Sequence, residues 1–158
     1  MFSKASTSTN TDLLSSRLYT ENTFYHKFTQ DLLNCKKEVI IESPYITAGR
    51  MKVFRSVFNK ILRKGVKIYI FTRDPEEHEL PMAYQAEAEI SNFERIGVQT
   101  FICSGNHHRK LAIIDREILW EGSLNILSQA YSREVMRRIE RQELAVEMFE
   151  FLGFKRFI

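Results

Sequence analysis

The stretch NHHRKLAIIDREILWEGSLNILS, residues 106–128, contains the strongest local signals in the chain. Two adjacent histidines and a basic pair precede an apolar run that ends at Asp115, and Gly-Ser-x-Asn follows a second apolar run. Short β-rich runs bounded by turn residues are typical of strands. The segments HRKLAIID and EILWEG therefore predict two neighbouring strands, joined by a turn at positions 115–117.

The polar side chains of the first predicted strand, HRKLAIID, are expected on both of its sides. Because side chains alternate between the faces of a strand, we expect His108 and Lys110 on one side and Arg109 and Leu111 on the other. An ammonium can hold an anionic oxygen, and an imidazole can attack phosphorus or move a proton, so the first pair suits a phosphate. Asp115 has the opposite parity and lies at the turn. We therefore expect it to support local structure rather than touch a substrate.

The element Gly122-Ser123-Leu124-Asn125 follows the second strand. A glycine permits close approach of another backbone or of a ligand. Ser123 and Asn125 share parity and supply neutral hydrogen-bond donors. We expect both side chains to face the same phosphoryl oxygens as Lys110.

The chain before this stretch alternates helices and strands. Apolar residues at helical spacing predict a helix over 23–36 and a second over 48–65. The apolar face of the second helix is expected to contain Val53, Val57, Phe58, Ile61 and Leu62. The runs EVIIESPYI, VKIYIFT and VQTFICS predict strands. The segment RDPEEHELPMAYQAEAEISNFERIG predicts a further helical region, in which Asp74 is the cap, Pro75 takes the first position and the acidic residues favour the helix dipole.

The chain after this stretch is more ambiguous. SREVMRRIE, residues 132–140, fits either a helix capped by Ser132 or a strand with Val135 and Ile139 facing inward. RQELAVEMFEFLG predicts a helix that stops at Gly153. The whole alternation predicts an α/β (α+β) fold with a mixed central β-sheet flanked by helices. Residues 1–16 are rich in Ser and Thr and predict a mobile tail, which leaves 17–158 as a single domain.

Composition narrows the class of protein. The chain of 158 residues is 44% hydrophobic and 27% charged, which is typical of a globular domain. It contains no apolar run of membrane-span length and no recognisable leader, so we expect a cytoplasmic protein without membrane association. The formal charge of +3 is compatible with a polyanionic partner. Cys35 and Cys103 lie far apart and are expected to be buried free thiols, without a zinc-type spacing.

The pattern His108-x-Lys110, four residues, Asp115, and then Gly-Ser-x-Asn resembles the H-x-K-x-x-x-x-D signature of the phospholipase D superfamily. The chain is similar over about residues 17–152 to the short, single-motif bacterial nucleases of that family. It also resembles phospholipase D-like modules at the ends of some helicases, which makes a helicase a possible partner. The resemblance favours the strand interpretation for residues 134–139.

The resemblance implies a role for each matching residue. His108 would be the nucleophile that forms a phosphohistidine, and Lys110 would bind the phosphate. Ser123 and Asn125 would orient and stabilise its oxygens, while Asp115 would buttress the motif. Members of the family also place a carboxylate after the Gly-Ser-x-Asn element to orient the imidazole, and the candidate here is Glu134.

The chemistry of phosphoryl transfer predicts a homodimer. In-line displacement puts the nucleophile and the group that protonates the leaving oxygen on opposite sides, so one imidazole cannot serve both roles in one step. The simplest second acid is His108 of another copy, across a two-fold axis. Two copies of Lys110 would supply positive charge, so we expect no metal and no cofactor.

The substrate is expected to be DNA or RNA, because the chain is basic and lacks a membrane-binding apolar stretch. The arginines expected to contact a nucleic-acid backbone are Arg109, Arg133, Arg137 and Arg138. Two other functions stay open: a non-catalytic nucleic-acid-binding or dimerisation module, and a phospholipase. The acidic run DPEEHE is explained by helix capping, and His107 by a place on the surface beside the motif.

Overall fold

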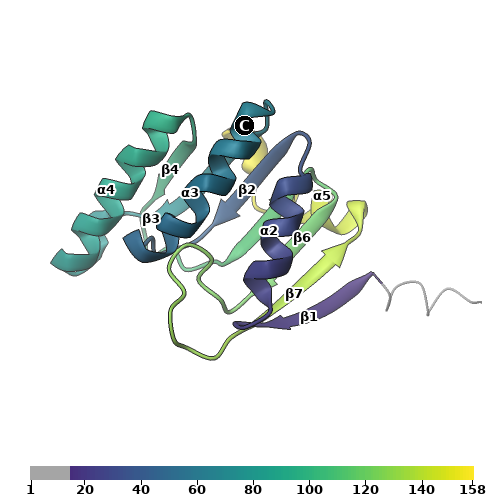
Figure 1. Ribbon diagram of the computed structural model, residues 1–158, viewed down its shortest axis with the longest axis horizontal. Helices are drawn as coiled ribbons and strands as arrows, with labels where there is room; N and C mark the ends of the chain where they lie inside the picture. The colour runs from purple at the N-terminus through teal and green to yellow at the C-terminus, as the bar shows by residue number, and fades with distance from the viewer. Residues whose placement is uncertain (1–14) are drawn as a thin grey trace, which may run out of the picture.

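The computed structural model describes residues 15–158 and contains one mixed sheet of seven strands in the order β1-β7-β6-β5-β2-β3-β4 (Figure 1). The strands are β1 (Ser16–Thr20), β2 (Glu38–Glu42), β3 (Lys67–Arg73), β4 (Gln99–Cys103), β5 (Leu111–Ile114), β6 (Ile118–Gly122) and β7 (Val135–Glu140). The helices are α2 (Phe24–Asn34), α3 (Ala48–Arg63), α4 (Leu80–Ile96) and α5 (Gln142–Phe151), with short 3₁₀ turns η1 (Pro75–Glu77) and η2 (Phe154–Arg156).

The sheet is parallel on one side and antiparallel on the other. Strands β2, β3 and β4 run parallel, because helices α3 and α4 carry the chain back between them. Strands β5, β6, β7 and β1 pair antiparallel, and β5 joins the two halves by pairing with β2. The expected mixed sheet flanked by helices is confirmed.

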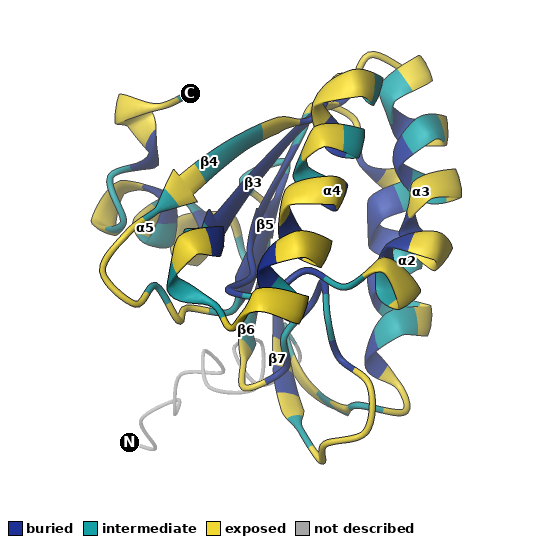
Figure 2. Ribbon diagram, turned by 90° about the vertical axis from the view of Figure 1, so that its left-hand side faces the viewer, coloured by how far each residue is buried: buried dark blue, intermediate teal, exposed yellow. Residues whose placement is uncertain are grey.

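Helices cover both faces of the sheet, with α2, α3 and α4 on one face and α5 on the other (Figure 2). The larger core lies under α2 and α3 and contains Trp120, Phe24, Phe28 and Phe54, all at most 1% exposed. The smaller core lies under α5 and η2 and contains Ile113, Phe149 and Phe154. Within residues 15–158 the structure contains no helix long and apolar enough to cross a membrane.

Strand β1 was not predicted. It lies at the edge of the sheet, where Ser16 to Thr20 pair with β7, and its side chains are mostly exposed. A short edge strand with little apolar patterning carries almost no signal in the sequence. Of the predicted tail over residues 1–16, positions 1–14 lie outside the described residues, and Ser16 belongs to β1.

The single helical region expected after β3 is two elements. Asp74 caps only the 3₁₀ turn η1, His78 is extended, and α4 begins at Leu80 with Pro81 in its first turn. Pro81 lacks a backbone N–H and its ring excludes a preceding helical turn, so a new helix starts there.

Four other predictions need revision. Helix α3 buries Met51 and Phe54 beside Phe58 and Ile61, whereas Val53 is 60% exposed, because the buried stripe is rotated by one residue. Strand β5 begins at Leu111 and does not include the histidines. Residues 135–140 form a strand, which rules out the helix alternative, but of the two residues expected to face inward only Ile139 is buried, and Val135 is 49% exposed. Cys103 is only partly buried.

Candidate active site

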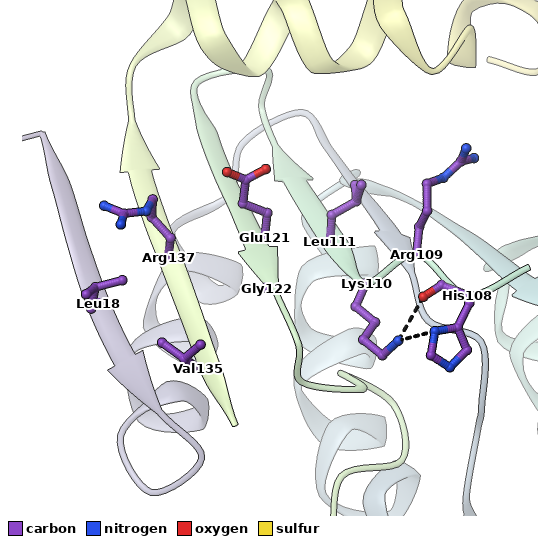
Figure 3. Close-up of a pocket in the computed structure, with 9 residues that line it drawn as sticks. All are labelled: Leu18, His108, Arg109, Lys110, Leu111, Glu121, Gly122, Val135 and Arg137. Atoms are coloured by element: carbon purple, nitrogen blue, oxygen red, sulfur yellow. Dashed lines mark hydrogen bonds between the residues drawn. The ribbon is translucent and has the colours of Figure 1, made fainter. Parts of the chain in front are cut away.

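The His-x-Lys segment lies at the edge of the sheet where β2 and β3 end and β5 begins. His107 to Lys110 precede β5 and lie outside the strands. His108 is exposed, and the Nζ of Lys110 lies 2.8 Å from its Nδ1 and 2.8 Å from its carbonyl oxygen (Figure 3). The two side chains that sequence parity placed together therefore meet, while Arg109 points to the opposite side.

Positive charge is concentrated around the imidazole. The pKa of His108 is lowered below its ordinary value, first by partial burial and then by the charges of Lys110 and Arg73. The pKa of Lys110 is lowered by burial, and the carboxylate of Glu134 opposes this effect. Cationic groups held close together favour an anion between them. The site is therefore suited to a phosphate, and a neutral imidazole is available in mildly acidic solution.

An open cavity of about 520 Å³ lies directly beside this pair and is lined by His108, Lys110, Gly122, Val135 and Arg137, among others (Figure 3). Its walls come from β5, β6, β7 and β1. The end of β6 and the start of β7 thus face the His-x-Lys segment across one hollow. A chain that passes through this hollow would meet both histidine and arginine.

Gly122 is required by the close approach of β7. A Cβ atom at this position would lie 2.2 Å from the carbonyl oxygen of Val135 and 2.9 Å from the Cα of Met136. The backbone N–H of Ser123 donates to that same carbonyl oxygen at 3.0 Å. The Oγ of Ser123 accepts from the N–H of Val135 at 3.1 Å, so its hydroxyl joins the two strand ends. Ser123 is exposed but is already engaged in the fold.

Asn125 closes the turn that follows. Its carbonyl oxygen accepts from the N–H groups of Ser128 and Gln129, at 3.1 and 2.8 Å. Its Oδ1 is buried and has no partner among the described residues. A buried amide oxygen without a hydrogen bond is costly, and it marks a position where a donor is missing.

Asp115 lies at the other end of β5, as its parity predicted. Its carboxylate accepts from the N–H groups of Lys36, Lys37 and Glu38, at 2.9, 2.7 and 3.1 Å, and the thiol of Cys35 lies 3.2 Å from Oδ1. Burial alone would raise the pKa of Asp115, but these hydrogen bonds outweigh it and lower the pKa. Asp115 therefore ties the β5–β6 turn to the start of β2 and lies away from the cavity.

The four arginines expected to contact a nucleic-acid backbone lie in different environments. Arg137 lines the cavity and Arg133 is exposed. Arg138 is only 8% exposed, because its guanidinium bonds both oxygens of Asp31, at 2.7 and 3.1 Å, under the helices. A residue buried in that way is not available to a nucleic-acid backbone. Arg109 bonds Glu42, but its side chain is 52% exposed and also lines the cavity.

Glu134 does not make the contact expected of it. The partner of the His108 Nδ1 among the described residues is Lys110, and the N–H of Glu134 donates to Glu21 at 2.9 Å. The charge of Glu134 acts on Lys110.

Two residues near the motif were misjudged from the sequence. His107 is not a surface group: its side chain is 8% exposed, and its Nε2 lies 4.0 Å from Glu42. Glu77 does not simply favour a helix dipole, because its carboxylate accepts from the N–H groups of Gly105 and Asn106, at 2.6 and 3.0 Å. Glu42 was missed entirely. A glutamate at the end of an apolar strand gives no local signal of its partner.

Comparison with known proteins identifies the family. A family model described as the PLD-like domain of cardiolipin synthase matches residues 28–152. The chain therefore belongs to the phospholipase D superfamily, as the motif predicted. No curated protein is similar enough in sequence to be counted as a relative.

Solved structures share the fold at low sequence identity. Nuc from Salmonella typhimurium, described as a phospholipase D family member, superposes with a TM-score of 0.70 at 17% identity, covering 87% of this chain and 90% of its own. NucT from Helicobacter pylori gives a TM-score of 0.65 at 17% identity, with 86% and 91% covered. A polyphosphate kinase from Porphyromonas gingivalis gives 0.68 at 10% identity, with 94% of this chain and 27% of the kinase covered.

No group of three or more His, Cys, Asp or Glu residues within 15–158 is arranged to hold a metal ion. The charged groups beside the imidazole are instead Lys110 and Arg73.

Proposed function

We propose that the protein is a phosphodiesterase that hydrolyses DNA or RNA through a covalent phosphohistidine on His108. The observation that carries the proposal is the contact of 2.8 Å between the Lys110 Nζ and the His108 Nδ1 beside an open cavity. An ammonium has no lone pair, so Lys110 donates to Nδ1 in this arrangement. A phosphate oxygen would compete for that ammonium and draw it from the ring.

The first chemical step forms a bond between a His108 ring nitrogen and phosphorus and breaks the bond from phosphorus to the leaving oxygen. The leaving oxygen takes a proton from a second acid. In the second step a water attacks the phosphohistidine, loses a proton to that same acid, and breaks the P–N bond. A 5′-phosphate is released when the leaving oxygen is the 3′ oxygen.

The second acid is His108 of another copy, so the active form is a homodimer with one shared site. His107 is buried on the other side of its segment, and His78 stacks on Tyr45 with ring centroids 5.0 Å apart. A two-fold axis beside the exposed His108 would bring its copy to the opposite side of the phosphorus.

Lys110 is the principal phosphate ligand within one copy. Once Lys110 has moved to the phosphate and the ring proton has shifted from Nε2 to Nδ1, Glu134 is a candidate to accept a hydrogen bond from Nδ1. We propose that Ser123 and Asn125 orient oxygens from the end of β6. The unpartnered Oδ1 of Asn125 would then bond Lys110 or a water at the site, rather than an anionic oxygen. The charge on the phosphate is met by lysines, and the mechanism needs no metal.

Nucleic acid is preferred to phospholipid because the open cavity is bordered by Arg137, with Arg133 exposed nearby in the chain. A backbone that follows these arginines would make several phosphate contacts. The sequence resemblance to single-motif nucleases supports the same substrate. The cytoplasm is the compartment proposed for this activity.

The test is turnover of single- and double-stranded DNA, RNA, a chromogenic phosphodiester and phosphatidylcholine vesicles, each with and without EDTA. We expect cleavage of a nucleic acid that is unaffected by EDTA and absent in His108→Ala. Binding without cleavage of any substrate would favour the binding-module alternative, and preferential turnover of the vesicles would favour a phospholipase. Complete inhibition by EDTA would overturn the metal-free mechanism, and a monomer under active conditions would overturn the shared site.

A further inference from the structure

The segment that carries His108 and Lys110 lies beyond the strand to which it belongs. Pairing between β5 and β2 begins where Leu111 lies opposite Glu42, so residues 107–110 extend past the last strand pair. Exposed polar segments at a strand end are usually the mobile parts of a domain. A site that must hold an imidazole against phosphorus needs some other source of rigidity.

Glu42 is placed to supply that rigidity. It is 0% exposed, and its carboxylate takes a two-pronged bond from Arg109, with Nε to Oε2 at 2.7 Å and Nη2 to Oε1 at 2.8 Å. The Nε2 of the buried His107 lies 4.0 Å from the same carboxylate. A buried carboxylate holds its cationic partner firmly, because releasing it would leave an unpaired charge away from water. The planar guanidinium adds a fixed orientation to that attachment.

Side chains alternate between the two sides of an extended chain, so fixing one side chain also fixes the direction of its neighbours. Glu42 holds Arg109 on one side, where the side chain of His107 is also buried, so His108 and Lys110 project to the other (Figure 3). Rotating the segment would expose the Glu42 carboxylate or strip it of its partners.

The start of the same segment is held by a second acid. The carboxylate of Glu77 accepts from the N–H groups of Gly105 and Asn106, at 2.6 and 3.0 Å. Arg73 bonds Glu77 at 3.1 Å and donates to the Oδ1 of Asn106 at 2.6 Å. The loop before His107 is therefore also attached to the ends of β3 and η1, which leaves the Glu42 attachment to orient the four residues that follow.

We propose that Glu42 is a positioning residue, which acts through Arg109 to fix the direction of His108 and Lys110. This inference rests on the proposed function for its effect on turnover, but its effect on the geometry of His108 can be measured separately. It assigns Arg109 the role of holding the segment, besides its place on the cavity wall.

The experiment compares Glu42→Gln with the parent by NMR titration of the His108 imidazole, assigned with His108→Ala, and by kcat and KM on a chromogenic phosphodiester. Loss of a nearby negative charge alone would lower a histidine pKa. Release of the segment instead separates the imidazole of His108 from Lys110, so we expect its pKa to rise toward the ordinary value. A misplacement of about 1 Å can cost about 100-fold in rate, so we expect kcat to fall by about 10- to 100-fold with KM little changed.

The matched control is Arg116→Gln, which breaks a similar ion pair of 2.6 Å with Glu38 at the other end of β2. It is expected to leave the His108 pKa and kcat at the parent values. Arg109→Lys keeps the charge but loses the two-pronged bond, and it should move both quantities in the direction of Glu42→Gln by a smaller amount. It takes the place of Glu42→Gln should that variant not fold.

An unchanged or lowered His108 pKa in the folded variant would overturn the positioning role. A rise in KM with kcat unchanged in Arg109→Lys would also contradict it, because that pattern marks a lost substrate contact. An inactive parent whose His108 pKa still rises in Glu42→Gln would refute the proposed function and leave the positioning role standing.

Discussion

The charged groups at the two ends of strand β5 differ in how far the fold supplies them with hydrogen-bond partners of opposite polarity. At one end the Asp115 carboxylate accepts three backbone N–H bonds within 3.1 Å and closes a turn. At the other end His108 is exposed, and its described hydrogen-bond partner is the neighbouring cation Lys110. Within one motif, the charge of Asp115 is fully hydrogen-bonded by the fold, whereas His108 and Lys110 lie together without an anionic hydrogen-bond partner among the described residues.

The difference shows which motif residues serve the fold and which are free for chemistry. The pKa of Asp115 is lowered because hydrogen bonds outweigh its burial, so the folded state favours its charge. The pKa values of His108 and Lys110 are also lowered, but here the folded state disfavours the positive charge. An anion beside them would reverse that effect, which is the electrostatic basis of a phosphate site.

The largest change is expected at the end of β5 that carries His108 and Lys110. His108→Ala should reduce kcat on a cleavable phosphodiester by at least about 10⁴-fold, because it removes the proposed nucleophile. Its free energy of unfolding should stay within about 0.5 kcal/mol of the parent value, because the side chain is exposed. Turnover assays and urea denaturation measure the two quantities. Parent-like activity would remove His108 from the mechanism.

At the Asp115 end of β5 we expect the opposite result, a large loss of stability with little change in activity. Asp115→Ala should lower the free energy of unfolding by about 2 to 4 kcal/mol, because backbone donors lose a charged acceptor. The kcat of the folded fraction should change by less than about threefold, since distant sites behave independently. Asp115→Asn, which keeps one acceptor oxygen, should lose less stability. Equal losses of stability in His108→Ala and Asp115→Ala would erase the contrast between the two ends.

A substitution at Gly122 tests how tightly β6 packs against β7 near the His108 end of β5. Gly122→Ala would press a Cβ onto the Val135 carbonyl and should lower the free energy of unfolding by about 1 to 3 kcal/mol. The matched control is Gly49→Ala in α3, where nothing lies within 4 Å and a gain of about 0.5 to 1 kcal/mol is expected. Both values come from urea denaturation. Equal stability of the two variants would show that β6 and β7 can separate without cost.

Acid should affect the two ends in different pH ranges. The imidazole must be neutral to attack, and its pKa lies below the ordinary histidine value of 6.5, so kcat/KM should fall with an acid midpoint below 6.5. The Asp115 contribution is present above its unfolded pKa, near 3.8, and is lost as pH falls through the lower folded pKa. Activity should therefore disappear before stability does. Profiles of kcat/KM and of unfolding against pH check this order, and coincident midpoints would contradict it.

The smallest effect is expected from Arg137 at the rim of the cavity. Arg137→Gln should raise KM for a nucleic acid about two- to fivefold and reduce the salt slope of binding by about one. Lys52→Gln on the exposed side of α3 is the control and should change neither. Titrations at several salt concentrations measure both slopes. An unchanged slope in Arg137→Gln would place the substrate path elsewhere.

Much of the fold and part of the site followed from local sequence signals. The apolar runs and turn residues identified strands β2 to β6 and helices α2, α3 and α5, because period and turn chemistry are properties of neighbouring residues. Parity placed His108 with Lys110, and the predicted turn at 115–117 placed Asp115 at the other end of the strand. Where the local pattern was weak, as in β1, or was interrupted by Pro81, the prediction failed.

Local sequence patterns were enough to find the residues able to do chemistry and to say which of them share a side of their strand. The partner of each residue depends on the folded chain. Arg109 pairs with Glu42, which is 67 positions away, and Arg138 pairs with Asp31 at a separation of 107. Arg138 is thereby buried, whereas Arg109 keeps its place on the cavity wall with one buried partner. The physical reason is that parity and charge belong to a short segment, whereas burial and ion pairing depend on strands and helices brought together from across the chain.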